Sequence, residues 1–128
     1  MNIFICIMNE LEKLINVSKT QAEVFLLDAG EFYPFGNYID KEDKVKPLLI
    51  YLENDMPKSQ EVIEVLEDSF QSGLLNEYKM AAIATDVLMT VKGEKLDALQ
   101  IRLFEDGKEV SEIYLKYIVN KDNVEFGN

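Results

Sequence analysis

The sequence contains no histidine. Catalysis by a Ser-His or Cys-His pair is therefore excluded, and so are zinc and haem sites with histidine ligands. Only one cysteine is present, Cys6, so the chain can form neither an internal disulfide nor a thiolate metal cluster. A single thiol without a disulfide framework is typical of a reducing compartment, and we expect a cytoplasmic protein.

Basic residues are few: the chain has 13 Lys and Arg and 24 Asp and Glu, which give a net charge of −11. This charge repels phosphate groups, so we expect no nucleic-acid partner and no binding to an anionic membrane surface. A basic protein partner would be attracted instead. The glycines are too scattered for a phosphate-binding loop, and the acidic stretches at 41–44 and 53–57 lack the ligand spacing of a calcium loop. We expect neither a cofactor nor a metal.

The chain of 128 residues has 48% hydrophobic residues, which suits one globular domain over residues 1–128. Its first residues, MNIFICI, are too short an apolar run to cross a membrane and lack the basic region of a secretion signal. Translation starts at Met1 or at Met8, and in the second case residues 1–7 are an N-terminal extension. Residues 120–128 are expected to form a polar tail.

The first half of the chain predicts two helices separated by two strands. Apolar residues recur every three or four positions over residues 8–28, which predicts a long helix with Gly30 as its C-terminal cap. Two strands then flank the polar turn KEDK, with Pro47 at a strand start or a sheet edge. A second helix carries a buried stripe formed by Val62, Ile63, Leu66, Phe70 and Leu74.

The second half, from Tyr78 onward, predicts three strands joined by three-residue hairpin loops at VKG and EDG. Loops of this length preserve parity, so one face of the sheet collects the odd-numbered apolar residues Ile83, Val87, Leu99, Ile101, Leu103, Ile113, Leu115 and Tyr117. We therefore predict an α+β domain in the order α-β-β-α-β-β-β. Its five antiparallel strands are covered by two helices on one face.

The outer face of this predicted sheet is more apolar than a solvated face needs, with Ala82, Ala84, Leu88, Ala98 and Phe104. It serves either as a surface for homo-oligomers or partners, or as the seat of a terminal segment such as the N-terminus. The first alternative describes a homo-oligomeric structural protein.

Carboxylates are the first candidates for chemistry in a chain without histidine. The predicted register places Asp97 on the apolar face, where it either meets a ligand or lies open to water at the strand start. Asp86 interrupts an apolar strand and either forms a structural pair with Arg102 or converges with Glu31 at one mouth of the sheet. Glu31, Asp86 and Asp97 are the candidate catalytic residues, should the protein be an enzyme.

The stretch GEFYPFG at residues 30–36 predicts a helix stop followed by a rigid aromatic wedge. Pro34 fixes its own backbone and extends Tyr33 before it, which directs Phe32 and Phe35 toward the core. Glu31 lies at the C-terminal end of the helix, where the helix dipole disfavours negative charge. Its carboxylate needs a partner, which is either internal or part of a ligand.

Three segments, GEFYPFG, AAIATDV and KLDALQIRLFEDG, resemble a group of small uncharacterised bacterial proteins that share an E-F-x-P-F-G motif. The resemblance covers about Leu11 to Tyr117 and implies one small α+β domain without an established activity. It points to a set of residues without saying whether they are structural: Glu31, Phe32, Pro34, Phe35, Gly36, Asp86 and Asp97. In size, acidity and architecture the chain is also similar to toxin-neutralising immunity proteins.

The leading hypothesis is a small acidic, non-enzymatic binding protein, with a toxin-neutralising immunity protein as its sharpest form. Its expected binding residues are Glu31, Tyr33, Glu61, Glu64, Glu67 and Asp68. The alternatives are a small enzyme or ligand-binding protein that uses Glu31, Asp86 and Asp97, and a homo-oligomer.

Overall fold

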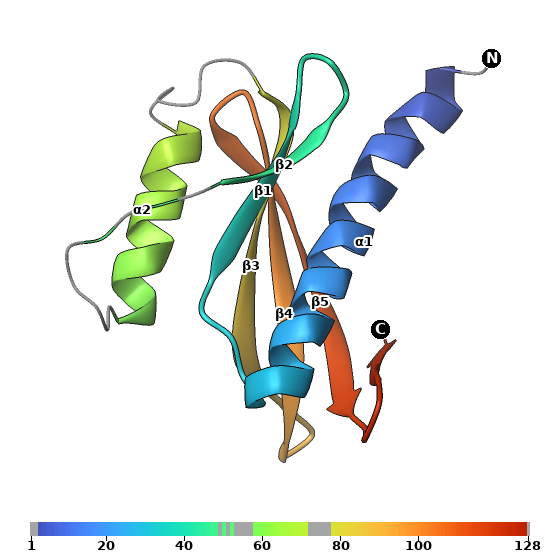
Figure 1. Cartoon of the computed structure of the whole chain (residues 1–128), viewed down its shortest axis with the longest axis vertical. Coiled ribbons are helices and arrows are strands. Elements are labelled where there is room, and N and C mark those ends of the chain that lie inside the picture. Colours follow the sequence, from blue (N-terminus) through green and yellow to red (C-terminus); the bar gives the residue numbers. More distant parts are fainter. Residues whose placement is uncertain (1–2, 49, 51, 53–57, 72–77, 128) are drawn as a thin grey trace.

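The computed structural model describes residues 3–48, 50, 52, 58–71 and 78–127. For residues 3–9 it describes the backbone but not the side chains. Two helices, α1 (Ile3–Ala29) and α2 (Ser59–Gln71), lie on opposite sides of one antiparallel sheet (Figure 1). The sheet has the strand order β2-β1-β3-β4-β5-β6. The strands are β1 (Phe35–Asp40), β2 (Val45–Leu48), β3 (Tyr78–Val91), β4 (Glu94–Glu105), β5 (Lys108–Val119) and β6 (Val124–Gly127).

The α+β class is confirmed, and the elements follow the predicted order with one strand added. Within the described residues, neither helix combines the length and apolarity that a membrane crossing requires. The acidic stretch at 53–57 and the predicted stripe residue Leu74 lie outside the described residues.

Helix α1 packs closely on the sheet because small side chains meet there. Ser18 and Ala22 are fully buried on the helix, and Ala82 and Ala84 are buried beneath it on β3. The helix ends as predicted, because Gly30 adopts a φ of 78° and its N–H donates to the carbonyl of Leu26 at 2.9 Å. This stop fixes the point at which the aromatic stretch leaves the helix.

Helix α2 packs on the other face of the sheet, so the prediction of two helices on one face is wrong. Its buried residues Val62, Leu66 and Phe70 contact Ile83 and Phe104. Successive residues of a strand point to opposite faces, and Ile83 is flanked by the two alanines that contact α1. The apolar residues on both faces of β3 therefore serve two helices, one on each side.

The hairpin between β3 and β4 explains this difference. Val91 pairs with Glu94, so the loop has two residues, and both Lys92 and Gly93 have positive φ, at 52° and 81°. Two such residues form the tight turn that suits the twist of a hairpin, whereas the predicted loop at VKG had three. Because the change of one residue reverses parity, Ile83 and Val87 lie on the face opposite to the one predicted.

The hairpin between β4 and β5 also has a two-residue turn, Asp106–Gly107, but a bulge restores the predicted parity. Glu105 pairs with Lys108, and the register shifts between Leu103 and Phe104. Beyond the shift, Leu99 pairs with Leu115. On the far side of the bulge from the turn, the odd-numbered residues of β4 and β5 therefore share the α1 face, as the sequence predicted.

Strand β6 occupies the segment that was predicted to be a polar tail, so that prediction is wrong for residues 124–127. Val124 pairs with Val119 and is buried against Leu26 and Tyr117. Phe126 packs against the same cluster. Their spacing of two residues is the period of a strand, but four residues give too short a pattern to distinguish from a tail.

The predicted apolar outer face does not exist as one surface. Ala82 and Ala84 lie under α1, which is the N-terminal cover that the sequence left open, and Ala98 and Phe104 are buried on the α2 face. Leu88 is exposed. Self-association of the chain thus stays a prediction, without the surface on which it was based.

Alanine substitutions of Gly107 and Gly93 test whether the β4–β5 turn lies close to the end of α2. A Cβ on Gly107 would lie 3.3 Å from the backbone oxygen of Gln71, whereas a Cβ on Gly93 would meet nothing within 4 Å. Both residues have positive φ, so alanine should cost about 1 kcal/mol at either position from backbone strain alone. We expect Gly107→Ala to lower the free energy of unfolding by a further amount of about 1 kcal/mol, measured by urea denaturation. Equal losses in the two variants would contradict the close approach.

Candidate binding site

The aromatic stretch after α1 builds a cluster of three phenylalanine rings. Ring centroids of Phe25 and Phe35 are 5.6 Å apart, and those of Phe32 and Phe35 are 5.5 Å apart. Pro34 is buried, and Phe32 and Phe35 pack against the α1-side core, as the wedge prediction required. Phe25 and Tyr33 remain 43% and 53% exposed. The cluster is thus anchored from below and open at its rim.

Asp86 fastens this stretch to the sheet. Its Oδ1 accepts a hydrogen bond of 2.7 Å from the hydroxyl of Tyr117, and its carboxylate also accepts one from the backbone N–H of Phe32. Burial raises the pKa of the Asp86 carboxyl, and the two hydrogen bonds oppose that shift. Burial and the hydrogen bond to Asp86 also raise the pKa of the Tyr117 hydroxyl. We call Asp86, Tyr117 and the Phe32 N–H the clasp.

Asp97 and Glu31 each act electrostatically on Asp86. The charges of Asp97 and Glu31 both raise the pKa of Asp86, and both act on Tyr117 as well. Asp86 therefore converges with Glu31, which was one of the alternatives left open. The other alternative, a pair between Asp86 and Arg102, is wrong, because Arg102 lies on the α2 face and binds Glu67 and Glu109 at 2.8 and 2.7 Å.

Three grooves surround these groups, and the carboxylates do not share one of them. The first, of about 300 Å³, lies over the phenylalanine cluster and is bordered by Asp28, Glu31 and Tyr33. A second, of about 280 Å³, is also lined by Glu31 and Tyr33 and reaches Ser59 at the start of α2. A third, of about 420 Å³, is lined by Asp97 and residues of β5 and β6. Asp97 is exposed, as the water-facing alternative proposed.

The end of α1 is unusually negative. No basic residue lies in its last turn, although the helix dipole already gives this end partial negative charge. Asp28 and Glu31 are both exposed, and among the described residues neither has a hydrogen-bond or ion-pair partner. The internal partner sought for Glu31 is therefore not found in the part of the chain that the structure describes.

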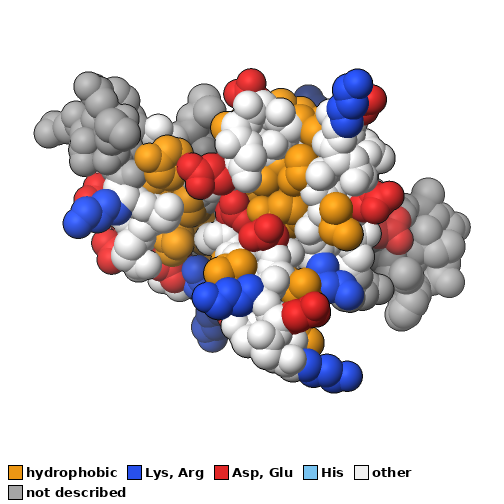
Figure 2. Space-filling view, turned by 90° about the horizontal axis from the view of Figure 1, so that it is seen from below, with side chains coloured by type: hydrophobic (Ala, Val, Ile, Leu, Met, Phe, Trp, Pro, Cys, Tyr) orange, Lys and Arg blue, Asp and Glu red, His pale blue; other side chains and the backbone are white. Residues whose placement is uncertain are grey.

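We call this region the acidic–aromatic end, comprising Phe25, Asp28, Glu31, Phe32, Tyr33, Phe35, Asp86 and Asp97. Seen from below Figure 1, hydrophobic side chains at this end of the molecule are interspersed with Asp and Glu, and Lys and Arg lie around them (Figure 2). The arrangement combines apolar contact area with negative charge. It is chemically suited to a cation that also carries an apolar part.

The remaining predicted binding residues lie on α2. Glu61, Glu64 and Asp68 are exposed there, whereas Glu67 forms the ion pair with Arg102 and so has a structural role. Because Ser59 borders the second groove, the first turn of α2 with Glu61 adjoins the acidic–aromatic end.

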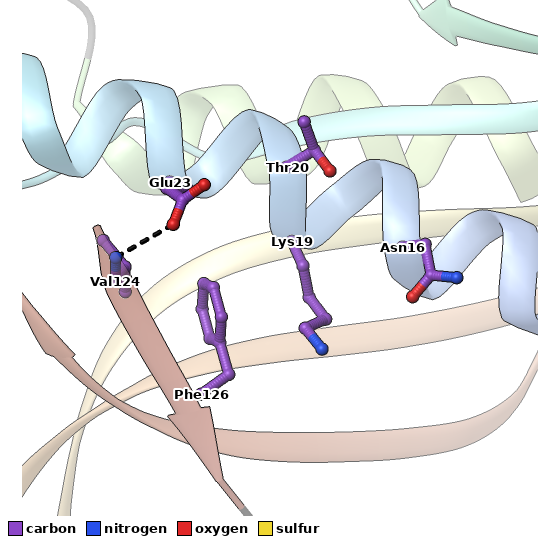
Figure 3. A pocket seen from close by; sticks show the side chains of 6 residues that line it. All are labelled: Asn16, Lys19, Thr20, Glu23, Val124 and Phe126. Carbon is purple, nitrogen blue, oxygen red and sulfur yellow. Dashed lines mark hydrogen bonds between the residues drawn. The ribbon is translucent and has the colours of Figure 1, made fainter. Parts of the chain in front are cut away.

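A further groove, of about 350 Å³, lies between α1 and β6 (Figure 3). Its charged groups are used to hold the edge strand. Glu23 accepts a hydrogen bond of 2.9 Å from the N–H of Val124, and the Lys19 ammonium lies 5.5 Å from the ring centroid of Phe126. These two contacts fix the short edge strand β6 to helix α1.

Sequence reasoning missed Phe25, Asp28 and Tyr117. Phe25 and Asp28 belong to the predicted helix, and only the position of the Gly30 stop indicates that they face the loop that follows. Tyr117 was predicted on the correct face, but its hydroxyl partner depends on a register that the hairpin prediction had wrong.

Among the described residues, no three Cys, Asp or Glu side chains gather closely enough to hold a metal ion. Compared with known protein families, curated proteins and solved structures, this chain finds no match.

Proposed function

We propose that this protein is a non-enzymatic binding protein that takes a basic segment of a partner protein at its acidic–aromatic end. The observation that carries the proposal is a pair of carboxylates, Asp28 and Glu31, that have no partner among the described residues and lie at the negative end of α1 beside an open aromatic groove. A partner with positive charge would neutralise groups that the described part of the chain leaves unpaired.

Charge and apolar contact have separate roles in such an interaction. The net charge of −11 speeds the encounter with a basic partner, and exposed acids on α2 such as Glu61 and Glu64 extend the negative field. Burial of Phe25 and Tyr33 then sets how long the complex lasts, because aromatic anchors carry much of the binding energy at interfaces.

The sharpest form of this proposal is an immunity protein that neutralises a basic toxin by covering its cationic surface. Small size, acidity and the α+β architecture support it by analogy. Its test is co-expression with a basic toxin encoded by a neighbouring gene. Growth should be restored by the wild-type chain and lost with Glu31→Lys, while the matched exposed variant Glu105→Lys should still protect.

An enzymatic role for Glu31, Asp86 and Asp97 has less support. The clasp occupies the Asp86 carboxylate with two hydrogen bonds, and Glu31 and Asp97 border different grooves. A general acid or base must reach the proton that it transfers, which the clasp prevents for Asp86. We therefore assign Asp86 to positioning of the binding segment.

The proposal is tested by a nuclear magnetic resonance titration of the labelled protein with a hexalysine peptide. Backbone signals of residues 25–35 should shift most, those of the β4–β5 turn should stay unchanged, and affinity should fall steeply between low and physiological salt. Shifts spread evenly over the surface, or shifts confined to α2, would overturn the proposal.

A further inference from the structure

We infer that the aromatic groove of the acidic–aromatic end accepts one arginine side chain of the partner. This inference rests on the proposed function and specifies the residue that the site recognises. The groove is lined by Phe25, Asp28, Ala29, Glu31, Phe32, Tyr33, Pro34 and Phe35. Its volume of about 300 Å³ is at the lower end of the range for ligand pockets, so it suits a single side chain.

The walls of the groove favour a cation with a flat face. Phe25 and Tyr33 are 43% and 53% exposed, which leaves aromatic surface available at the rim. The ring cluster holds Phe25 at 6.5 Å from Phe32 and 5.6 Å from Phe35, between centroids, so the floor is fixed before a ligand arrives. Guanidinium groups stack on aromatic faces and lose less hydration energy than ammonium groups when they do so.

The rim of the groove favours a cation with several N–H donors. Asp28 and Glu31 each offer two carboxylate oxygens without a partner among the described residues. Carbonyl groups at the C-terminal end of α1 add further acceptors, since only part of that end is capped by Gly30. A guanidinium has five donors in a planar fork, whereas a quaternary ammonium ion has none and would leave both carboxylates unsatisfied.

The same chain already pairs its own cations with aromatic rings. The Arg102 guanidinium lies 5.4 Å from the ring centroid of Phe104 and binds Glu67 and Glu109 at the same time. This internal arrangement of one ring, one guanidinium and two carboxylates is the chemistry that we infer for the groove. Arg102 itself is held on the α2 face and cannot supply the groove.

The experiment compares three small probes by nuclear magnetic resonance titration: N-acetyl-arginine amide, N-acetyl-lysine amide and N-acetyl-citrulline amide. Citrulline has nearly the shape of arginine but no charge. We expect the arginine probe to shift the ring signals of Phe25 and Tyr33, and to bind at least about fivefold more tightly than the lysine probe. Citrulline should bind more than about tenfold more weakly than arginine, because a charged hydrogen bond is lost.

Two variants locate the effect. Glu31→Gln should weaken the arginine probe by about tenfold. Glu105→Gln makes the same change of charge at an exposed position at the end of β4 that is far from Asp97. This control should leave the affinity for the arginine probe unchanged. Both variants keep the side-chain size and remove no packing, so folding is preserved.

The outcomes separate this inference from the proposed function. If hexalysine binds at the acidic–aromatic end but the arginine, lysine and citrulline probes do not differ, the arginine pocket is wrong and the proposed function stands. If the arginine probe binds elsewhere, or Glu31→Gln does not weaken it, the inference is also overturned. If hexalysine itself fails to shift residues 25–35, the proposed function fails first.

Discussion

Replacement of Phe104 by alanine is expected to lower the free energy of unfolding by about 3–5 kcal/mol. The Phe104 side chain is fully buried on the α2 face, with its ring centroid 5.7 Å from that of Phe70. Removal of the ring would leave a cavity between α2 and the sheet and take away the aromatic face under the Arg102 guanidinium. Urea denaturation of the wild type and the variant measures the difference.

This experiment distinguishes the two-sided sheet from the one-sided arrangement that the sequence predicted. With both helices on one face, Phe104 would lie on the uncovered face and its truncation would cost little. The control is Val110→Ala on β5, where the valine is 53% exposed and we expect a loss below about 0.5 kcal/mol. A loss for Phe104→Ala as small as that of the control would contradict a helix on each face.

Replacement of Asp86 by alanine is expected to lower the free energy of unfolding by about 1–3 kcal/mol, because it leaves the Tyr117 hydroxyl and the Phe32 N–H without an acceptor. The same change should weaken the hexalysine interaction, since residues 30–35 lose their attachment to the sheet. Asp86→Asn keeps an acceptor and removes the repulsion from Glu31 and Asp97, so it should be nearly as stable as the wild type at neutral pH. If Asp86→Ala and Asp86→Asn lower the free energy of unfolding equally, the hydrogen bonds of the clasp do not account for the loss of stability.

The comparison of wild type with Asp86→Asn also predicts a pH dependence. The pKa of Asp86 is raised in the folded protein, so the folded state takes up a proton more readily than the unfolded chain does. The resulting stabilisation is complete below the ordinary value of 3.8 and is lost as the pH rises through the folded pKa. The stability of the wild type relative to Asp86→Asn should therefore fall over this window. A constant or rising difference would contradict a raised pKa.

Local signals in the sequence predicted the structure of the segment that carries the candidate site. Gly30 was predicted as the helix stop, and the rigid Tyr33–Pro34 pair was predicted to direct Phe32 and Phe35 inward, because both effects depend on the backbone preferences of neighbouring residues. The unfavourable position of Glu31 and its need for a partner were predicted from the same segment, since the charge of a helix end depends on residues within one turn.

The surroundings of Asp86 could not be predicted, because they depend on the length of a hairpin loop. The tight turn at Lys92–Gly93 places Asp86 opposite Leu99 and on the α1 face, whereas a loop one residue longer would have turned it toward Arg102. A lysine with positive φ is uncommon, and the sequence gives little warning of it. One residue of register thus decides whether Asp86 pairs with Arg102 or with the hydroxyl of Tyr117.

The most direct test of the binding site is the affinity of hexalysine for two charge-reversal variants, measured by titration calorimetry at low salt. Glu31→Lys and Glu105→Lys change the net charge equally, and both positions are exposed, but only Glu31 borders the aromatic groove. We predict a loss of at least about tenfold in affinity for Glu31→Lys and less than about twofold for Glu105→Lys. Equal losses would show that net charge alone attracts the peptide, and they would contradict a binding site at the acidic–aromatic end.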